Sequence, residues 1–203
     1  MRINKTKFLG AMIFLTILMD VVPHFGFTRI GSISITVMHI PPILSSIVLG
    51  PISGMLIGLL FGIISLMRAV SRESAVLDTL LQNPLISVLP RVIFPLISGK
   101  IYQFLMEHFA TRRENIAVGA SALVGACCNS VLVLSMLYLI YPDRFLSVMQ
   151  LDSGQNVLVL LLNAFGPNLL VEALLALAVC IGFMYLLHRR EAKKQSGPSA
   201  LRK

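Results

Sequence analysis

The stretch SITVMHIPPILSSIVLGPISGMLIGLLFGIISL, residues 34–66, decides the fold, because it contains no Asp, Glu, Lys or Arg. A helix that crosses a membrane needs about 20 mostly apolar residues, with about 17–25 tolerated. This stretch can supply two such helices, a short one over residues 35–49 and another over 52–68. Gly50 and Pro51 fit a very tight turn between them. The sequence therefore predicts two adjacent membrane helices here.

The rest of the chain has the same character. Of its 203 residues, 56% are hydrophobic and 13% are charged, whereas soluble domains carry about 25% charged residues. Such a chain cannot cover its surface with charge, so we expect lipid to cover most of it. Four further apolar segments predict membrane helices, over residues 7–22, 85–107, 116–140 and 157–187. We interpret the first as a retained helix and not a signal peptide, because no small-residue cleavage site follows it.

The distribution of basic residues predicts the orientation. Twelve of the 17 lie near the N-terminus, around the connection between the fourth and fifth segments, and in the C-terminal tail. Cytoplasmic loops are enriched in Lys and Arg, so both termini are expected in the cytoplasm. The expected fold is an all-α integral membrane protein, a bundle of six transmembrane helices forming one domain over residues 1–188. A basic, disordered cytoplasmic tail is expected over 189–203. The basic residues follow no single face, so the bilayer is the expected partner and nucleic acid is not.

Five polar residues interrupt the apolar segments: His39, Arg91, Asn129, Asn163 and Glu172. Each has a structural explanation: Arg91 could reach the lipid headgroups, His39 could cap a helix, the asparagines could join neighbouring helices, and Glu172 could be a neutral, hydrogen-bonded acid. Taken together they favour a binding pocket. The guanidinium fork suits a carboxylate, and amides suit hydroxyls or amides. The predicted ligand is a small polar acid that enters from outside.

Prolines and glycines shape the helices that carry these residues. Pro90 and Pro95 flank Arg91 in NPLISVLPRVIFPL, residues 83–96, and leave backbone carbonyls free where a helix lines a cavity. Glycines recur every four residues from Gly50 to Gly62. This stripe predicts close helix packing, either within the chain or against a partner.

Several catalytic signatures are absent from the sequence. It contains no GxxxxGK[ST] phosphate loop, no HExxH metal motif and no GxSxG nucleophile motif. The three cysteines lie in apolar segments and fit core positions better than a metal site or a disulfide framework. We therefore expect no ATP hydrolysis by this chain, no metal, no cofactor and no enzymatic activity.

The stretch at 34–66 resembles the second and third helices of the substrate-binding S components of energy-coupling-factor (ECF) vitamin transporters. NPLISVLPRVIFPLISG, CCNSVLVLSMLYL and NAFGPNLLVEALLALAV are similar to later helices of that family, and its pantothenate-type branch is closest. The resemblance implies six helices in the bacterial plasma membrane and high-affinity capture of a vitamin from outside. It also implies partners, namely a membrane coupling protein and two ATPase subunits. His39, Arg91, Asn129 and Asn163 would line the pocket, with Glu172 a weaker candidate and Arg91 opposite the pantothenate carboxylate.

Other functions stay open at this point. Another vitamin or precursor could bind, such as riboflavin, folate or a thiamine precursor, although the absence of Trp and the presence of only four Tyr favour an aliphatic acid. A small intramembrane enzyme could use Glu172 and His39, although their predicted depths differ by several helical turns. A membrane scaffold that binds no ligand is the third alternative.

Overall fold

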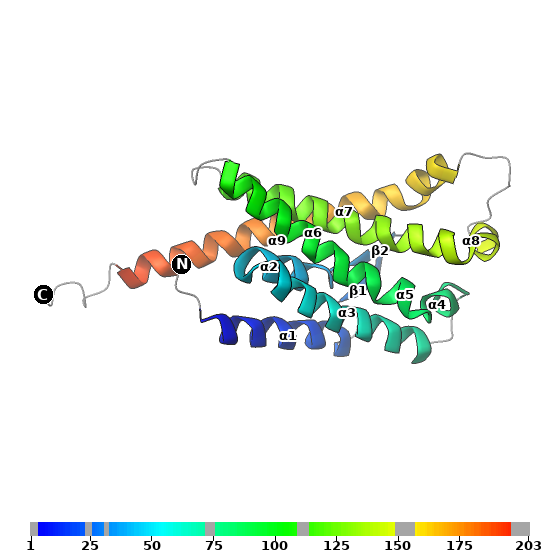
Figure 1. The fold of residues 1–203 in the computed structure, drawn as a ribbon, viewed down its shortest axis with the longest axis horizontal. Coiled ribbons are helices and arrows are strands. Elements are labelled where there is room, and N and C mark those ends of the chain that lie inside the picture. Colours follow the sequence, from blue (N-terminus) through cyan, green and yellow to red (C-terminus); the bar gives the residue numbers. More distant parts are fainter. Residues whose placement is uncertain are drawn as a thin grey trace, which may run out of the picture.

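The computed structural model describes residues 4–22, 26–30, 33–71, 76–108, 114–148 and 157–195. Helices dominate this part of the chain, and Figure 1 shows them as an elongated bundle. They are α1 (Lys5–Val21), α2 (Ile40–Leu49), α3 (Pro51–Ser71), α4 (Val76–Leu81), α5 (Pro84–Ser87), α6 (Leu89–His108), α7 (Glu114–Ile140), α8 (Pro142–Val148) and α9 (Val157–Gln195). One antiparallel hairpin, formed by β1 (Phe27–Ile30) and β2 (Ile33–Thr36), joins them.

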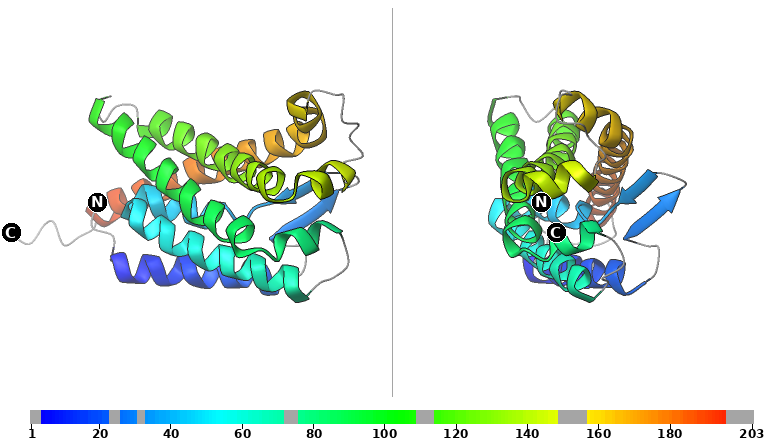
Figure 2. Two further views of the ribbon diagram at one scale, coloured as in Figure 1. Left: turned by 45° about the vertical axis from the view of Figure 1, so that its right-hand side comes forward. Right: turned by 90° about the vertical axis from the view of Figure 1, so that its right-hand side faces the viewer.

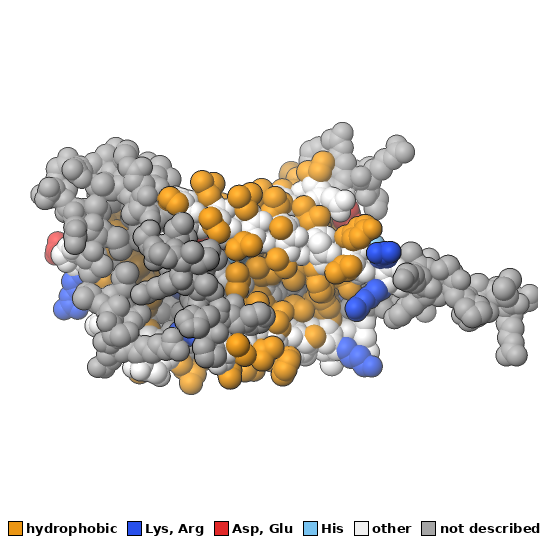
Figure 3. All heavy atoms as spheres, turned by 180° about the vertical axis from the view of Figure 1, so that it is seen from behind, with side chains coloured by type: hydrophobic (Ala, Val, Ile, Leu, Met, Phe, Trp, Pro, Cys, Tyr) orange, Lys and Arg blue, Asp and Glu red, His pale blue; other side chains and the backbone are white. Residues whose placement is uncertain are grey.

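Within the part of the chain that the structure describes, four helical segments are long and apolar enough to cross a membrane: Pro51–Ser71, Pro84–His108, Glu114–Ile140 and Gly166–Arg190. The helix α1 has 17 residues and the apolar helix α2 has ten, which correspond to lengths of about 25 and 15 Å. Figure 3 shows hydrophobic side chains spread across the middle of one face, with Lys and Arg side chains toward its ends. The prediction of long apolar helices is therefore confirmed, and four of them have the length and composition to cross a membrane.

Local sequence signals explain several helix ends. The Asn4 side chain caps α1 by accepting a hydrogen bond from the Lys7 N–H at 3.2 Å. Prolines stand at the start of α2, where a missing N–H breaks no helical hydrogen bond. Gly50 ends α2 with a φ of 105°, and α3 begins at the next residue. The predicted tight turn between the two helices is confirmed.

Other predicted boundaries need correction. The second segment was expected to be helical from residue 35, but residues 33–36 form β2, so the fold is not purely α-helical. Residues 33–36 read ISIT, and three of them, Ile33, Ile35 and Thr36, are β-branched and favour a strand. The fourth segment is divided into α5 and α6 at Val88. The last helix continues past residue 188 to Gln195, into the segment expected to be a tail.

The glycine stripe packs within the chain. The helix α3 lies against α2 and α6. A Cβ atom added at Gly54 would meet Ser46 of α2, one at Gly58 would meet the Arg91 carbonyl of α6, and one at Gly62 would meet the Val88 backbone. Gly50 has open space around it and serves as the cap of α2. Three of the four glycines thus let α3 approach two neighbouring helices closely.

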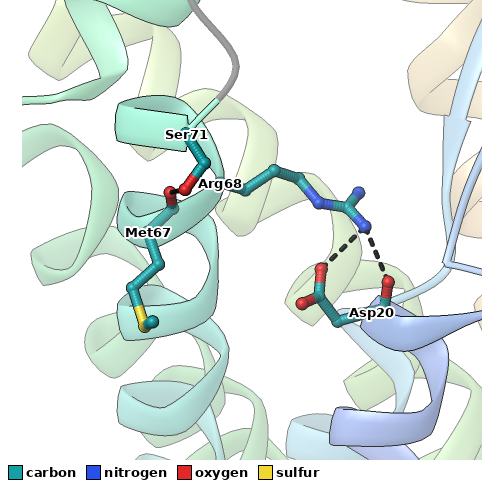
Figure 4. Close-up of polar contacts among 4 residues, drawn as sticks. All are labelled: Asp20, Met67, Arg68 and Ser71. Atoms are coloured by element: carbon teal, nitrogen blue, oxygen red, sulfur yellow. Dashed lines mark hydrogen bonds and ion pairs between the residues drawn. The ribbon is translucent and has the colours of Figure 1, made fainter.

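The two ends of the bundle differ. Figures 1 and 2 show the hairpin toward the end where α4, α5 and α8 lie, whereas α1 begins and α9 ends at the opposite end. At the hairpin end, an ion pair joins α1 to α3: Arg68 Nη2 lies 2.7 Å from Asp20 Oδ1 and donates to the Asp20 carbonyl at 3.1 Å (Figure 4). This ion pair holds the last turn of α1 against α3 at the hairpin end of the bundle.

Candidate substrate site

Arg91 lies in the first turn of α6 and is turned into the bundle, with only 7% of its surface exposed. Its guanidinium lies over the Phe61 ring of α3, with Cζ 5.7 Å from the ring centroid. At that distance a cation is attracted by the face of the ring. The guanidinium is thus held inside the protein, and it does not extend to the protein surface as the headgroup interpretation requires.

The proline before Arg91 explains its hydrogen bond. In a continuous helix, the N–H of residue 90 would bond to the carbonyl of Ile86, but Pro90 has no N–H. Arg91 Nη1 donates to that carbonyl instead, at 2.7 Å. The Leu-Pro-Arg sequence therefore creates a free acceptor and supplies its donor. The Nε atom of Arg91 is buried and has no hydrogen-bond partner among the described residues.

His39 occupies the N-cap position of α2, but its side chain makes no capping hydrogen bond. The imidazole is fully buried. The ring approaches the backbones of Thr36 and Glu172, yet neither ring nitrogen reaches good hydrogen-bond geometry with any described residue. A buried polar group usually has a partner, and the nearest polar groups to this ring are the backbones of Thr36 and Glu172.

Glu172 of α9 is buried, and both of its carboxylate oxygens are engaged. Oε1 accepts a hydrogen bond from the Thr36 N–H at 2.7 Å, and Oε2 accepts one from the Ser130 hydroxyl of α7 at 3.4 Å. Thr36 and Ser130 were not predicted from the sequence. Ser130 follows Asn129 directly, but nothing in the sequence pairs either residue with Glu172.

The two asparagines differ in what the structure describes. Asn129 lies on α7, is 6% exposed, and its Oδ1 atom is buried without a hydrogen-bond partner among the described residues. Asn163 lies in α9, but its side chain is outside the described part of the structure. Other buried hydroxyls are satisfied: Ser46 donates to the Pro95 carbonyl at 2.7 Å, and Ser98 to the Ser121 carbonyl at 2.9 Å.

The structure thus brings some of the predicted residues together. His39 and Glu172 meet at the end of β2, although the sequence placed them several turns apart, and Asn129 adjoins the serine that binds Glu172. Arg91 makes no hydrogen bond to His39, Asn129 or Glu172 within the described residues; its guanidinium donates to the Ile86 carbonyl and lies over the Phe61 ring. Buried polar atoms that have no hydrogen-bond partner among the described residues therefore occur on α6, on α7 and at the start of α2.

The helices of membrane-spanning length define, by length and composition, a helical membrane protein, and its interior holds polar atoms that have no hydrogen-bond partner among the described residues. A sequence model described as "ECF transporter, substrate-specific component" matches residues 8–184, and the chain belongs to this family. The predicted resemblance is confirmed. Membership of a family of transporter components also confirms the expectation that the chain is not an enzyme.

The chain is also similar to a curated relative, the pantothenate transporter PanT of Leuconostoc mesenteroides subsp. mesenteroides. The two are 25% identical over 135 residues, which are 63% of this chain and 66% of the relative. The match thus spans just under two thirds of the relative's length.

Proposed function

We propose that this chain is the substrate-binding membrane subunit of an ECF-type vitamin uptake transporter, and that its vitamin is pantothenate. Family membership supports the role of the subunit, and the similarity to a pantothenate transporter supports the choice of vitamin. Arg91 carries the assignment of a carboxylate ligand, because its buried Nε has no acceptor among the described residues. Guanidinium groups bind carboxylates strongly and with defined geometry.

The proposed site includes four of the predicted residues as ligand contacts. Arg91 would bind the carboxylate, and His39, Asn129 and Asn163 would bind hydroxyl or amide groups. The proposed contacts of His39 and Asn129 with the ligand are supported by their buried polar atoms, which have no hydrogen-bond partner among the described residues. The proposed contact of Asn163 is supported by its sequence position and by the family resemblance. Glu172 has both oxygens engaged within the chain, so its contribution is a separate proposal.

The membrane topology is part of the same proposal. Six membrane helices would be α1, α2, α3, the α5–α6 segment, α7 and α9, with both termini in the cytoplasm of a bacterial cell and the hairpin outside. The common end at which α1 begins and α9 ends supports this arrangement (Figure 1). The predicted single domain over 1–188 and tail over 189–203 belong to it. A cysteine-free variant carrying Ser32→Cys or Ser196→Cys tests it: an impermeant thiol reagent on intact cells should label the first and not the second.

Transport would require partners, which we propose are a membrane coupling protein and two ATPase subunits. The sequence has no phosphate-loop motif of its own, so ATP-driven import depends on other chains. Co-expression of the tagged chain with the coupling protein and ATPases of its host should yield a complex that hydrolyses ATP. Pantothenate uptake by cells that lack either ATPase would contradict this part of the proposal.

Ligand binding is tested with the purified protein in detergent. Pantothenate should raise the apparent melting temperature, because a ligand that binds the native state stabilises it by mass action. Riboflavin, folate and a thiamine precursor should not. Arg91→Ala should abolish the shift while leaving a folded protein. Arg144→Ala is the matched control, since Arg144 is exposed on α8. A shift with riboflavin alone, or an unchanged pantothenate shift in Arg91→Ala, would overturn the assignment.

A further inference from the structure

Glu172 connects three parts of the protein that are far apart in sequence. Through Oε1 it holds the N–H of Thr36, which is the last residue of β2, at 2.7 Å. Through Oε2 it holds the Ser130 hydroxyl of α7 at 3.4 Å. The carboxylate is buried, with 7% of the residue exposed. One side chain thus fastens the end of the hairpin to α9 and α7.

The segment that follows Thr36 carries His39 into the bundle. Only two residues separate them, and both ends of this short segment are tied. The Val37 N–H donates to the Gly26 carbonyl at 3.1 Å, and the Ile40 N–H donates to the Val37 carbonyl at 3.1 Å. Because Val37 follows Thr36 directly, these two hydrogen bonds and the one from the Thr36 N–H to Glu172 together hold the turn that leads to His39.

Direct contact between Glu172 and the ligand fits these contacts poorly. An incoming group would have to displace hydrogen bonds that the carboxylate already makes to Thr36 and Ser130. The proposed ligand is itself a carboxylate, and an acidic side chain offers it no favourable ion pair. Hydrogen bonds to a charged group are also costly to break when the partner is left buried.

We propose that Glu172 is a positioning residue: it fixes β2 and the turn that carries His39 in the geometry that binds the ligand, without touching the ligand. That the protein binds a ligand, and that this ligand is pantothenate, rests on the proposed function. The anchoring of the hairpin does not, because it follows from the two hydrogen bonds of the carboxylate.

Substitution of Glu172 by Gln distinguishes a positioning role of this side chain from an effect of its negative charge. In Glu172→Gln the amide oxygen can still accept from the Thr36 N–H, and the amide nitrogen can donate to the Ser130 hydroxyl, so both connections survive without the charge. Glu172→Ala removes both. We expect Glu172→Gln to bind pantothenate within about threefold of the wild type, and Glu172→Ala to lose about tenfold or more in affinity. Leu174→Ala is the control, since Leu174 is exposed on the same helix.

Hydrogen exchange of the peptide spanning residues 33–38, followed by mass spectrometry, measures the anchoring without any ligand. Glu172→Ala should exchange faster there, while Glu172→Gln and Leu174→Ala should match the wild type. Ser130→Ala, which removes the longer hydrogen bond, should show a smaller change in the same direction. If Glu172→Ala does not fold, the hydrogen exchange of Ser130→Ala at residues 33–38 tests the anchoring in its place.

The outcomes distinguish the two proposals. Glu172→Gln could lose as much affinity as Glu172→Ala while its hydrogen exchange at residues 33–38 matches the wild type. In that case the charge of Glu172 acts on the ligand, and the proposed positioning role is wrong. If Glu172→Ala shows wild-type hydrogen exchange at residues 33–38 and wild-type affinity, the proposal that Glu172 anchors the hairpin is wrong as well. A wild-type protein that binds no pantothenate, with the expected exchange pattern in the variants, would contradict the proposed function and leave the anchoring role supported.

Discussion

Gly58 of α3 lies directly against the backbone carbonyl of Arg91 in α6. That carbonyl is free of the usual helical hydrogen bond, because the residue four positions later is Pro95, which has no N–H. A glycine opposite it lets the two backbones approach, where a Cα–H can contact the carbonyl oxygen. The glycine in α3 and the proline in α6 are therefore complementary parts of one helix contact.

Gly58→Ala should destabilise the protein, because a Cβ atom at this position would collide with the Arg91 carbonyl and must push α3 away from α6. Overpacking of this kind costs about 1–3 kcal/mol. The apparent melting temperature in detergent should fall, and pantothenate binding should weaken as Arg91 shifts. Gly182→Ala is the matched control, since a Cβ atom there meets nothing within 4 Å. Equal melting temperatures for the two variants would contradict the close contact.

Arg91 should have two separable roles. Arg91→Met leaves the Ile86 carbonyl without the donor that Arg91 Nη1 provides at 2.7 Å, and an unpaired buried carbonyl costs about 1–3 kcal/mol. Adding Pro90→Ala supplies a backbone N–H that can bond to the same carbonyl. The double variant should therefore regain melting temperature without regaining pantothenate binding. Recovery of binding would show that the guanidinium does not contact the ligand.

The pair Asp20–Arg68 should contribute little to global stability. The two side chains are 31% and 19% exposed, and ion pairs in such surroundings are typically worth about 0–1 kcal/mol. A double-mutant cycle with Asp20→Asn and Arg68→Gln isolates the coupling of the pair from other effects of each substitution. The coupling measured by thermal unfolding should be about 1 kcal/mol or less and should decrease with added salt. A coupling several times larger would mean that the pair is shielded from solvent.

The sequence predicted the long helices well. The segments expected over 52–68 and 116–140 correspond to α3 at Pro51–Ser71 and α7 at Glu114–Ile140. This success has a physical cause, because a membrane-spanning chain must satisfy its backbone internally and an apolar run of this length leaves little choice but a helix. Residues 33–36 escaped prediction because a short apolar strand and the start of a helix have the same hydropathy.

The polar contacts were only partly predictable. The bond from Arg91 to Ile86 is local, and the positions of Pro90 and the free carbonyl four residues before it were visible in the sequence. The bond from Thr36 to Glu172 joins residues 136 apart, and no periodicity within a helix can reveal such a pairing. The sequence therefore indicated which residues are polar and buried, but not which of them are already satisfied by the chain.

The end of the bundle opposite the hairpin offers a test of whether changes in binding are specific to the site. There Glu114 of α7 accepts a hydrogen bond from the Tyr102 hydroxyl of α6 at 3.3 Å and lies 3.5 Å from His188 Nε2 of α9. His188 is 45% exposed, so these contacts should be worth about 1 kcal/mol together. Glu114→Ala should lower the melting temperature slightly and leave the affinity for pantothenate unchanged. If its affinity falls as far as that of Glu172→Ala, loss of binding would reflect general loosening of the bundle and not the hairpin anchor.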